Sequence, residues 1–198
     1  MALLLIALGY LLGSIPTGWI LTRILRGQDL RSVGSGATGA TNTRRALGTR
    51  WGIVAMVVDV VKGFAAIEIA RTTDASAGVL AFVGVAVILG HCWPIWLGFK
   101  GGKGIAPGFG SAVGLSPYML VLAPILVAVV WRWRYVSLGS IVAAGVTGPI
   151  LLLLAILDLA PWSYLLFGVI GAPLVLWRHR ANIERIRAGT EPKLRASV

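Results

Sequence analysis

Long apolar segments alternate with short polar ones along almost the whole chain. Apolar runs cover about residues 2–24, 51–70, 77–99, 136–157 and 162–177. Most of these runs reach the roughly 20 residues that a straight helix needs to cross a bilayer. The pattern therefore predicts helices that span a membrane, joined by short connections.

The region 105–131 is also apolar, but Pro107, Gly108, Gly110, Gly114 and Pro117 divide it. The resulting segments, 105–116 and 118–131, are each too short for a straight span, so they form either two short spans or one re-entrant hairpin. We predict an all-α polytopic membrane protein with one domain, residues 1–198. Its seven transmembrane helices include a short fourth and a short fifth helix.

Polar segments between the apolar runs carry nearly all of the Lys and Arg residues. With seven spans, the segments 25–50, 100–104 and 132–135 and the C-terminal tail lie on the same side as Arg23 at the inner end of the first span, and only Lys62 and Arg71 fall elsewhere. Basic loops mark the cytoplasmic side of a membrane protein. We therefore expect an outside N-terminus and a cytoplasmic C-terminus in the cell (inner) membrane.

The composition supports this interpretation and narrows the function. Hydrophobic residues make up 57% of the chain and charged residues only 13%, which excludes an ordinary soluble domain. In this composition the net charge of +11 indicates a cytoplasmic face and anionic lipids or ligands rather than nucleic acid. The single cysteine, Cys92, excludes an internal disulfide and a cysteine metal cluster. We expect no metal, no cofactor and a monomer.

The segment 34–45 is rich in small and hydroxyl residues and ends in two arginines. Glycines leave backbone amides free to converge on an anion, and arginine offers a planar fork that suits phosphate oxygens. The segment is therefore either a phosphate-binding loop or an ordinary flexible cytoplasmic loop. Its candidate ligands are Ser35, Gly36, Gly39, Thr41, Asn42 and Arg45.

Neither glycine-rich segment matches a nucleotide fingerprint. The spacing Gly34-x-Gly36-x-x-Gly39 follows a membrane span instead of a strand, and Gly101-Gly102-Lys103-Gly104 lacks the Walker spacing. The second segment remains a glycine-rich loop in which Gly102 and Lys103 can bind a phosphate. The alternative is a basic anchor on the cytoplasmic side.

Other polar residues stand at helix ends on the same side. Arg134, Ser137 and Ser140 mark the start of a helix, where hydroxyls either cap it or bind an anion. His179 and Asn182 are three residues apart after the last span, so they share a helix face.

Two charged residues lie inside a span. Asp59 and Lys62 are three residues apart, and an ion pair is favoured over a proton relay because lone charges are costly in a bilayer. His91, near the inner end of the third span, fits a packing or hydrogen-bonding role better than a catalytic one.

The polar segments lie at one surface, whereas a transporter places its polar site near the midplane. This favours an interfacial enzyme for a phosphorylated water-soluble substrate and a lipid. The alternative is a transporter of an anionic lipid precursor that uses Asp59 and Lys62.

In their order between the spans, the motifs resemble those of the bacterial acyl-phosphate-dependent glycerol-3-phosphate acyltransferases, the PlsY type. The resemblance covers nearly the whole chain, with one departure, Ala37, where the family usually has Asn. The motifs are Gly13-Ser14-Ile15-Pro16-Thr17-Gly18, Gly34-Ser35-Gly36, Gly39-Ala40-Thr41-Asn42 with Arg45, Asp59 with Lys62-Gly63, Gly90-His91, Phe99-Lys100-Gly101-Gly102-Lys103-Gly104, Arg134-Tyr135-Val136-Ser137-Leu138-x-Ser140, His179-Arg180-x-Asn182-Ile183 and Gly189-Thr190-Glu191.

The resemblance implies an acyltransferase that moves a fatty acyl group from acyl phosphate to the sn-1 hydroxyl of glycerol 3-phosphate. The products would be lysophosphatidic acid and phosphate, in the first acylation of phospholipid biosynthesis. The partners would be glycerol 3-phosphate, acyl phosphate and membrane lipids. The expected catalytic residues are Ser35, Arg45, Lys103, His179 and Asn182. Among them His179 and Asn182, with Ser140, would orient glycerol 3-phosphate and the reacting carbonyl.

Overall fold

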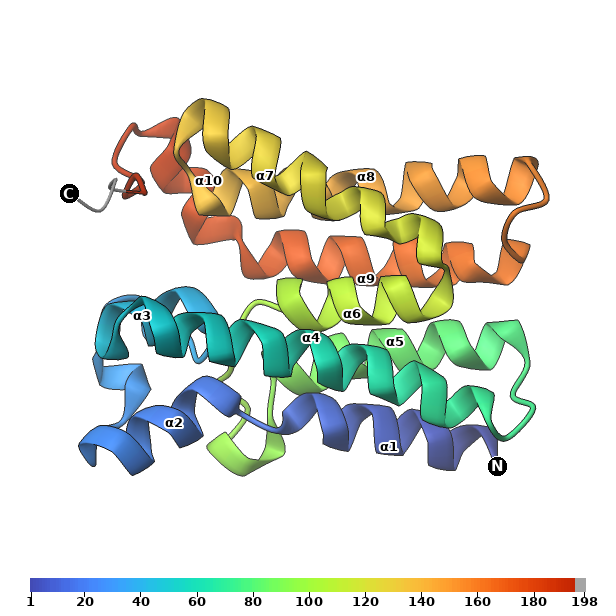
Figure 1. Ribbon diagram of the computed structural model, residues 1–198, viewed down its shortest axis with the longest axis horizontal. Helices are drawn as coiled ribbons and strands as arrows, with labels where there is room; N and C mark the ends of the chain where they lie inside the picture. The colour runs from blue at the N-terminus through green and yellow to red at the C-terminus, as the bar shows by residue number, and fades with distance from the viewer. Residues whose placement is uncertain (195–198) are drawn as a thin grey trace.

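The structure, a computed structural model, describes residues 1–194 and is helical throughout, with no β-strand in that range. This confirms the expected all-α class, while Arg195 of the predicted basic tail lies outside the described residues. The long helices lie lengthwise beside one another (Figure 1): α1 (Ala2–Ser14), α4 (Thr49–Arg71), α5 (Ala77–Cys92), α6 (Ile105–Leu115), α7 (Leu122–Trp133), α8 (Val136–Ile156) and α9 (Leu165–Arg178).

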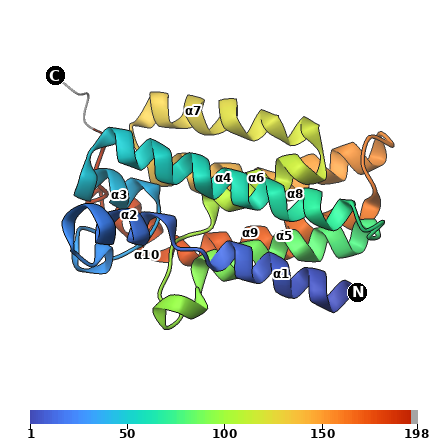
Figure 2. The ribbon, with the colours of Figure 1, turned by 60° about the horizontal axis from the view of Figure 1, so that its bottom comes forward.

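Short helices complete the bundle. Three α-helices gather at the end away from the N-terminus (Figure 2): α2 (Thr17–Arg26), α3 (Ala40–Leu47) and α10 (Arg180–Arg187). The 3-10 turns are η1 (Leu30–Ser32), η2 (Ile95–Leu97), η3 (Pro117–Val121) and η4 (Trp162–Tyr164).

Three helical stretches are long and apolar enough to cross a membrane: Ala2–Arg26, Ala77–Leu97 and Val136–Ile156. The outer surface of the bundle carries many exposed large apolar side chains, such as Leu3, Val127 and Val169. An apolar surface of this extent is stable in lipid and not in water. The protein is therefore an integral membrane protein.

Helix α5 is the centre of the bundle, because it packs against α1, α4, α6 and α9. Glycines make the closest crossings possible. A Cβ on Gly13 would overlap the backbone of Val87, and one on Gly110 would overlap that of Val60. Small residues at such crossings let helix backbones approach closely where lipid provides no hydrophobic driving force.

The divided region 105–131 runs to the far end of the bundle and back. Helix α6 begins at Ile105 and runs toward the end that holds the N-terminus, where η3 reverses the chain, and α7 returns toward the opposite end (Figure 1). The chain therefore breaks between α6 and α7, as the sequence predicts, and η3 joins the two helices.

Two predicted boundaries need correction. The segment 25–50 is not a plain loop, because it contains η1 and α3. The third apolar run does not continue to Phe99 as one helix: α5 ends at Cys92, and Pro94, which lacks an N–H group, begins a turn. The predicted gathering of polar segments is clear in Figure 1, where the same end of the bundle holds 25–48, 93–104, 133–136 and 178–194.

Candidate active site

The buried side chain of Asn42 fixes the conformation of the first glycine-rich segment, residues 34–45. Its Oδ1 accepts a hydrogen bond from the Ser35 amide at 3.1 Å, and its Nδ2 donates to the carbonyls of Val33 and Ala37, both at 2.9 Å. Asn42 was predicted to bind phosphate, but its amide is occupied within the loop. Ala37 takes part through its backbone carbonyl, so the departure from the family pattern leaves this bond in place.

Three other predicted ligands of this segment have exposed side chains. The side chains of Ser35, Thr41 and Arg45 are exposed at the polar end of the bundle. Gly36 has a φ of 70°, in the left-handed region that glycine adopts easily, but its amide donates to the Val33 carbonyl at 3.0 Å and is not free for a phosphate. The loop therefore offers hydroxyls and one guanidinium at its surface.

The second glycine-rich segment is held at both its amides and its carbonyls. The Gly102 amide donates to the His91 carbonyl at 2.9 Å, and the Gly101 amide donates to the Cys92 carbonyl at 3.2 Å. The Arg178 guanidinium donates to the Gly102 carbonyl at 3.0 Å and to the Gly101 carbonyl at 3.2 Å. The amide of Gly102 is therefore not free for a phosphate, and the glycines serve to place Lys103.

A buried hydrogen-bond network positions the Lys103 ammonium. Lys103 Nζ donates to Asn182 Oδ1 at 2.6 Å, and Asn182 Nδ2 donates to Glu191 Oε1 at 2.7 Å. Ser137 Oγ donates to the same carboxylate oxygen at 2.6 Å, and Arg185 Nε donates to Oε2 at 2.7 Å. The predicted residues Asn182 and Ser137 thus bind Glu191, and Lys103 is linked to Glu191 through Asn182. Glu191 was not among the expected site residues.

Burial, together with the nearby charges of Arg185, Arg45 and Arg178, lowers the pKa of Lys103 to about 8, against the attraction of Glu191. Burial raises the pKa of Glu191, but hydrogen bonds from its donors outweigh that effect and leave its pKa below the usual range. The site is therefore a cluster of cations with one buried carboxylate, an arrangement that attracts anions.

His179 is buried beside this cluster. Burial lowers its pKa to about 4, although its hydrogen bond to Val175 opposes the shift. Its Nδ1 lies 2.8 Å from the Val175 carbonyl oxygen, which can only accept, so Nδ1 carries the proton. The neutral ring therefore keeps a lone pair on Nε2.

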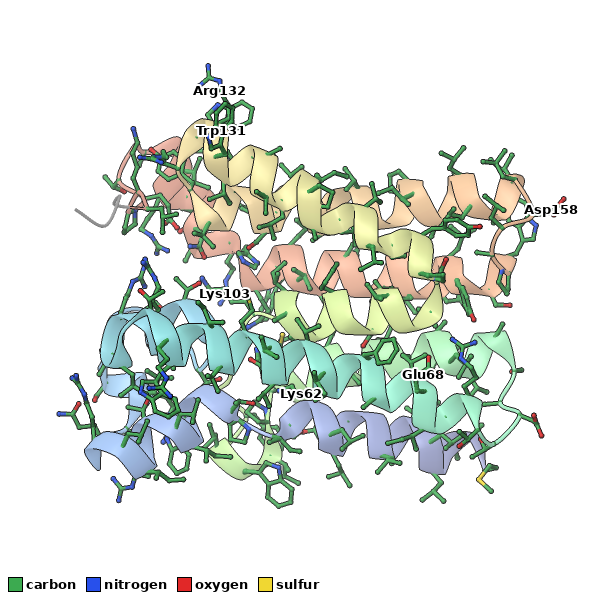
Figure 3. The ribbon with its side chains drawn as sticks, viewed as in Figure 1. Lys62, Glu68, Lys103, Trp131, Arg132 and Asp158 are labelled. Atoms are coloured by element: carbon green, nitrogen blue, oxygen red, sulfur yellow. The ribbon has the colours of Figure 1, made fainter. Side chains whose placement is uncertain are left out.

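Two predicted residues lie apart from this cluster. Ser140 Oγ donates to the Val136 carbonyl of its own helix at 2.9 Å, so its hydroxyl bonds within α8 and does not cap the helix, whose N-cap residue is Tyr135. Arg134 is exposed, and its carbonyl accepts from the Leu194 amide at 2.6 Å. Figure 3 shows Lys103 between α3 and the junction of α9 with α10, whereas Arg132 points away from the bundle.

Sequence reasoning missed Glu191 and Arg178 as site residues. Glu191 follows the last helix, and its only signal was the Gly189-Thr190-Glu191 motif. Arg178 is one of many basic residues on this side, and only the folded chain shows that it binds the carbonyls of the second glycine-rich segment.

Fold and site together define a helical integral membrane protein with a basic, anion-attracting site at one end. The sequence profile of the family described as "Glycerol-3-phosphate acyltransferase" matches residues 3–189. The chain belongs to this family, and it is an acyltransferase.

Curated relatives of the same family are similar to this chain over most of their length. The glycerol-3-phosphate acyltransferase of Parasynechococcus marenigrum (strain WH8102) is 46% identical over 194 residues, covering 98% of this chain and 90% of the relative. That of Gloeobacter violaceus (strain ATCC 29082 / PCC 7421) is 42% identical over 193 residues, covering 95% and 92%.

Two solved structures have a fold similar to that of this chain. The crystal structure of PlsY (YgiH), an integral membrane glycerol 3-phosphate acyltransferase, in its glycerol 3-phosphate form has a TM-score of 0.89 at 38% identity, covering 97% of this chain and 94% of that one. The lysophosphatidic acid form gives a TM-score of 0.87 at 36% identity, with the same coverage.

Proposed function

We propose that this acyltransferase moves a fatty acyl group from acyl phosphate to the sn-1 hydroxyl of glycerol 3-phosphate. The acylation of glycerol 3-phosphate is the activity that the family carries. The single observation that supports the placement of the site is the convergence on Lys103 of Arg45, Arg178 and Arg185, with Asn182 holding the ammonium at 2.6 Å. Two phosphate groups brought close together need such a cluster, because their mutual repulsion must be neutralised.

The reaction balances without a covalent intermediate. The sn-1 hydroxyl oxygen bonds to the acyl carbonyl carbon, the bond from that carbon to the phosphate oxygen breaks, and inorganic phosphate leaves with its electron pair. Acyl phosphate is a mixed anhydride whose leaving group needs no nucleophilic side chain. Positioning and charge neutralisation therefore supply most of the catalysis.

The roles divide by geometry. Arg45 and Lys103, with the hydroxyls of Ser35 and Thr41 and the amide of Gly39, bind phosphate oxygens. Asn182 and Glu191 hold the Lys103 ammonium in place. These assignments combine the exposed donors of the first segment with the buried network of the second.

His179 orients the attacking hydroxyl. Its Nε2 lone pair can accept the hydroxyl hydrogen bond, but a pKa of about 4 makes the ring a weak base. A phosphate oxygen of the substrate, with a pKa of about 6, is the stronger base and takes the proton. His179 remains the alternative base.

The enzyme assay uses detergent-purified protein with labelled glycerol 3-phosphate and, separately, palmitoyl phosphate, palmitoyl-CoA and palmitoyl-acyl carrier protein. We expect lysophosphatidic acid from palmitoyl phosphate alone. Product from a thioester donor would overturn the donor assignment. A folded protein without product from any donor would instead favour the transporter, since a transporter needs sealed vesicles and makes no product.

The site assignment has a matched control. Arg45→Ala and Lys103→Ala should lower turnover by more than about 100-fold, as expected when a charged contact in the transition state is lost. Arg132→Ala removes the same charge at an exposed position on α7 that points away from Lys103 (Figure 3) and should leave the rate unchanged. Near-normal rates in both site variants would contradict the assignment.

We further propose seven spans, an outside N-terminus and a site on the cytoplasmic side of the cell (inner) membrane. Cys92 is the only cysteine and is buried, so a Cys92→Ala background accepts single reporters. Thr73→Cys should react with a membrane-impermeant thiol reagent in intact cells, and Lys100→Cys only after permeabilisation. The reverse result would overturn the orientation. One chain contributes every site residue, so we expect a monomer to be active.

A further inference from the structure

A polar cluster lies in the apolar interior directly beneath the two glycine-rich segments. It consists of Asp59 and Lys62 on α4, His91 at the end of α5, and Thr17 at the start of α2. The exposed fractions are only 1% for Asp59, 6% for Lys62 and 7% for His91. Burial of an unpaired charge is costly, so buried charged groups are expected to be paired and hydrogen-bonded or to have a functional role.

All three hydrogens of the Lys62 ammonium have an acceptor. An ammonium group has three hydrogens to donate, and Lys62 Nζ lies 2.8 Å from Asp59 Oδ1, 2.8 Å from the Ile15 carbonyl oxygen and 3.1 Å from His91 Nδ1. Asp59 Oδ1 also accepts from Thr17 Oγ1 at 3.0 Å. The pair therefore has no hydrogen left for a transported ligand, which argues against a transport site here.

This arrangement decides where His91 carries its proton. The Lys62 ammonium can only donate, so Nδ1 of His91 must accept, and the neutral ring has its hydrogen on Nε2. Within residues 1–194 no hydrogen-bond partner contacts Nε2, and this atom is not among the fully enclosed unpartnered polar atoms. A donor on a side chain that is more than nine-tenths buried is thus left without a partner.

The free Nε2–H group lies where the two glycine-rich segments meet. A Cβ on Gly102 would overlap Nε2, and a Cβ on Gly39 would lie 3.9 Å from it. His91 also accepts the Gly102 amide at its carbonyl, at 2.9 Å. Glycine at these two positions therefore gives the imidazole access to the space between the segments.

We propose that His91 donates its Nε2–H group to a substrate phosphate oxygen bound between the two segments, and that Lys62 and Asp59 are positioning residues for this donor. The proposal rests on the proposed function, since it names a phosphate of that reaction. Either glycerol 3-phosphate or acyl phosphate can supply the oxygen. A neutral donor at this place completes the binding of the anion without adding to the repulsion among the surrounding cations.

Two substitutions separate the two nitrogens. The terminal amide of Asn reaches the position of Nδ1, so His91→Asn keeps an acceptor for Lys62 but has no donor toward Gly102. The longer Gln reaches the position of Nε2, so His91→Gln keeps that donor but gives up the acceptor for Lys62. Steady-state kinetics with each substrate varied in turn, together with the thermal midpoint of each variant, measures both effects.

We expect His91→Asn to raise the KM of one substrate by about 10- to 100-fold, the loss typical of a hydrogen bond to a charged group. His91→Gln should stay within about threefold of the wild type for that KM. The substrate whose KM rises identifies the phosphate. An unchanged KM for both substrates in His91→Asn, with kcat falling only as thermal stability falls, would overturn the proposal and leave His91 a packing residue.

The positioning role has its own readout. The chain has two histidines, and the structure gives them opposite tautomers, Nε2–H in His91 and Nδ1–H in His179. In protein labelled with 15N-histidine, the imidazole spectrum should show one ring of each kind. The doubly neutral variant Asp59→Asn with Lys62→Met should mix the His91 tautomers and raise the same KM. A His91 ring that carries its proton on Nδ1 in the wild type would overturn this role.

Failure of this inference is distinguishable from failure of the proposed function. A wild-type protein that makes no lysophosphatidic acid contradicts the function itself. An active wild type with a normal KM in His91→Asn contradicts only the assignment of His91.

Discussion

The pH dependence of the enzyme tests the central role of Lys103. Burial and three neighbouring arginines lower the pKa of its ammonium from 10.5 to about 8. A shift of this size corresponds to about 3 kcal/mol against the charged form in the folded protein. The ammonium is nevertheless the form that binds a phosphate, so the enzyme needs the charge that its own fold disfavours.

The expected profile follows from this pKa. The free enzyme keeps most of its Lys103 protonated at pH 7 and about one tenth at pH 9, so kcat/KM for glycerol 3-phosphate should fall about tenfold over that interval. The substrate phosphate, with a pKa of about 6, is already about nine-tenths ionised at pH 7 and adds almost no change. His179, with a pKa of about 4, adds no acid limb above about pH 5.

Lys103→Arg is the matched control, because a guanidinium stays charged throughout this range. Its kcat/KM should be lower at pH 7, since the fork cannot reproduce the contact with Asn182, but it should stay level up to pH 9.5. Rates are corrected for alkaline hydrolysis of acyl phosphate in blanks without enzyme. A wild-type profile that is level to pH 9.5, or an equal alkaline fall in Lys103→Arg, would refute the reasoning.

Stability should respond in the opposite sense to activity. Because the folded protein gives up the Lys103 proton at lower pH than the unfolded chain, stability should rise with pH between about 8 and 10.5. Lys103→Met removes the cost of the buried charge and leaves Asn182 Oδ1 without its donor, two effects of similar size. We expect an inactive protein whose thermal midpoint stays within a few degrees of the wild type.

Two further predictions concern packing and the buried carboxylate. Glu191→Ala takes away the acceptor of Asn182 Nδ2 and should lower the free energy of unfolding by about 1–3 kcal/mol per donor left unpaired. Activity should also fall more than in Arg132→Ala. A thermal midpoint equal to that of the wild type would contradict this prediction. Gly13→Ala would place a methyl group against the backbone of α5 and should lower the yield of folded protein in detergent. Gly145→Ala is the control, because its methyl group would meet open space, and it should leave the yield unchanged. Equal yields from the two variants would show that the close crossing is unimportant.

The sequence by itself determined the class of the protein and the sidedness of its polar groups. Apolar runs near 20 residues require helices in a bilayer, since no other local structure satisfies the backbone there. The unequal distribution of basic residues predicted which connections share a surface. The motifs around Lys103, Asn182 and Arg45 predicted the kind of chemistry, because phosphate recognition needs cations next to glycine-rich backbone.

The tertiary structure alone decided which side chains face the ligand and which support it. Asn42 and Gly102 looked like phosphate ligands, but their polar groups are used inside the protein. Glu191 looked like part of a tail, but it holds Asn182 and thereby Lys103. Hydrogen bonds between residues far apart in the chain leave no periodic signal in the sequence. Only the packing of the helices brings such partners together, and so only the fold could show how this site is held in place.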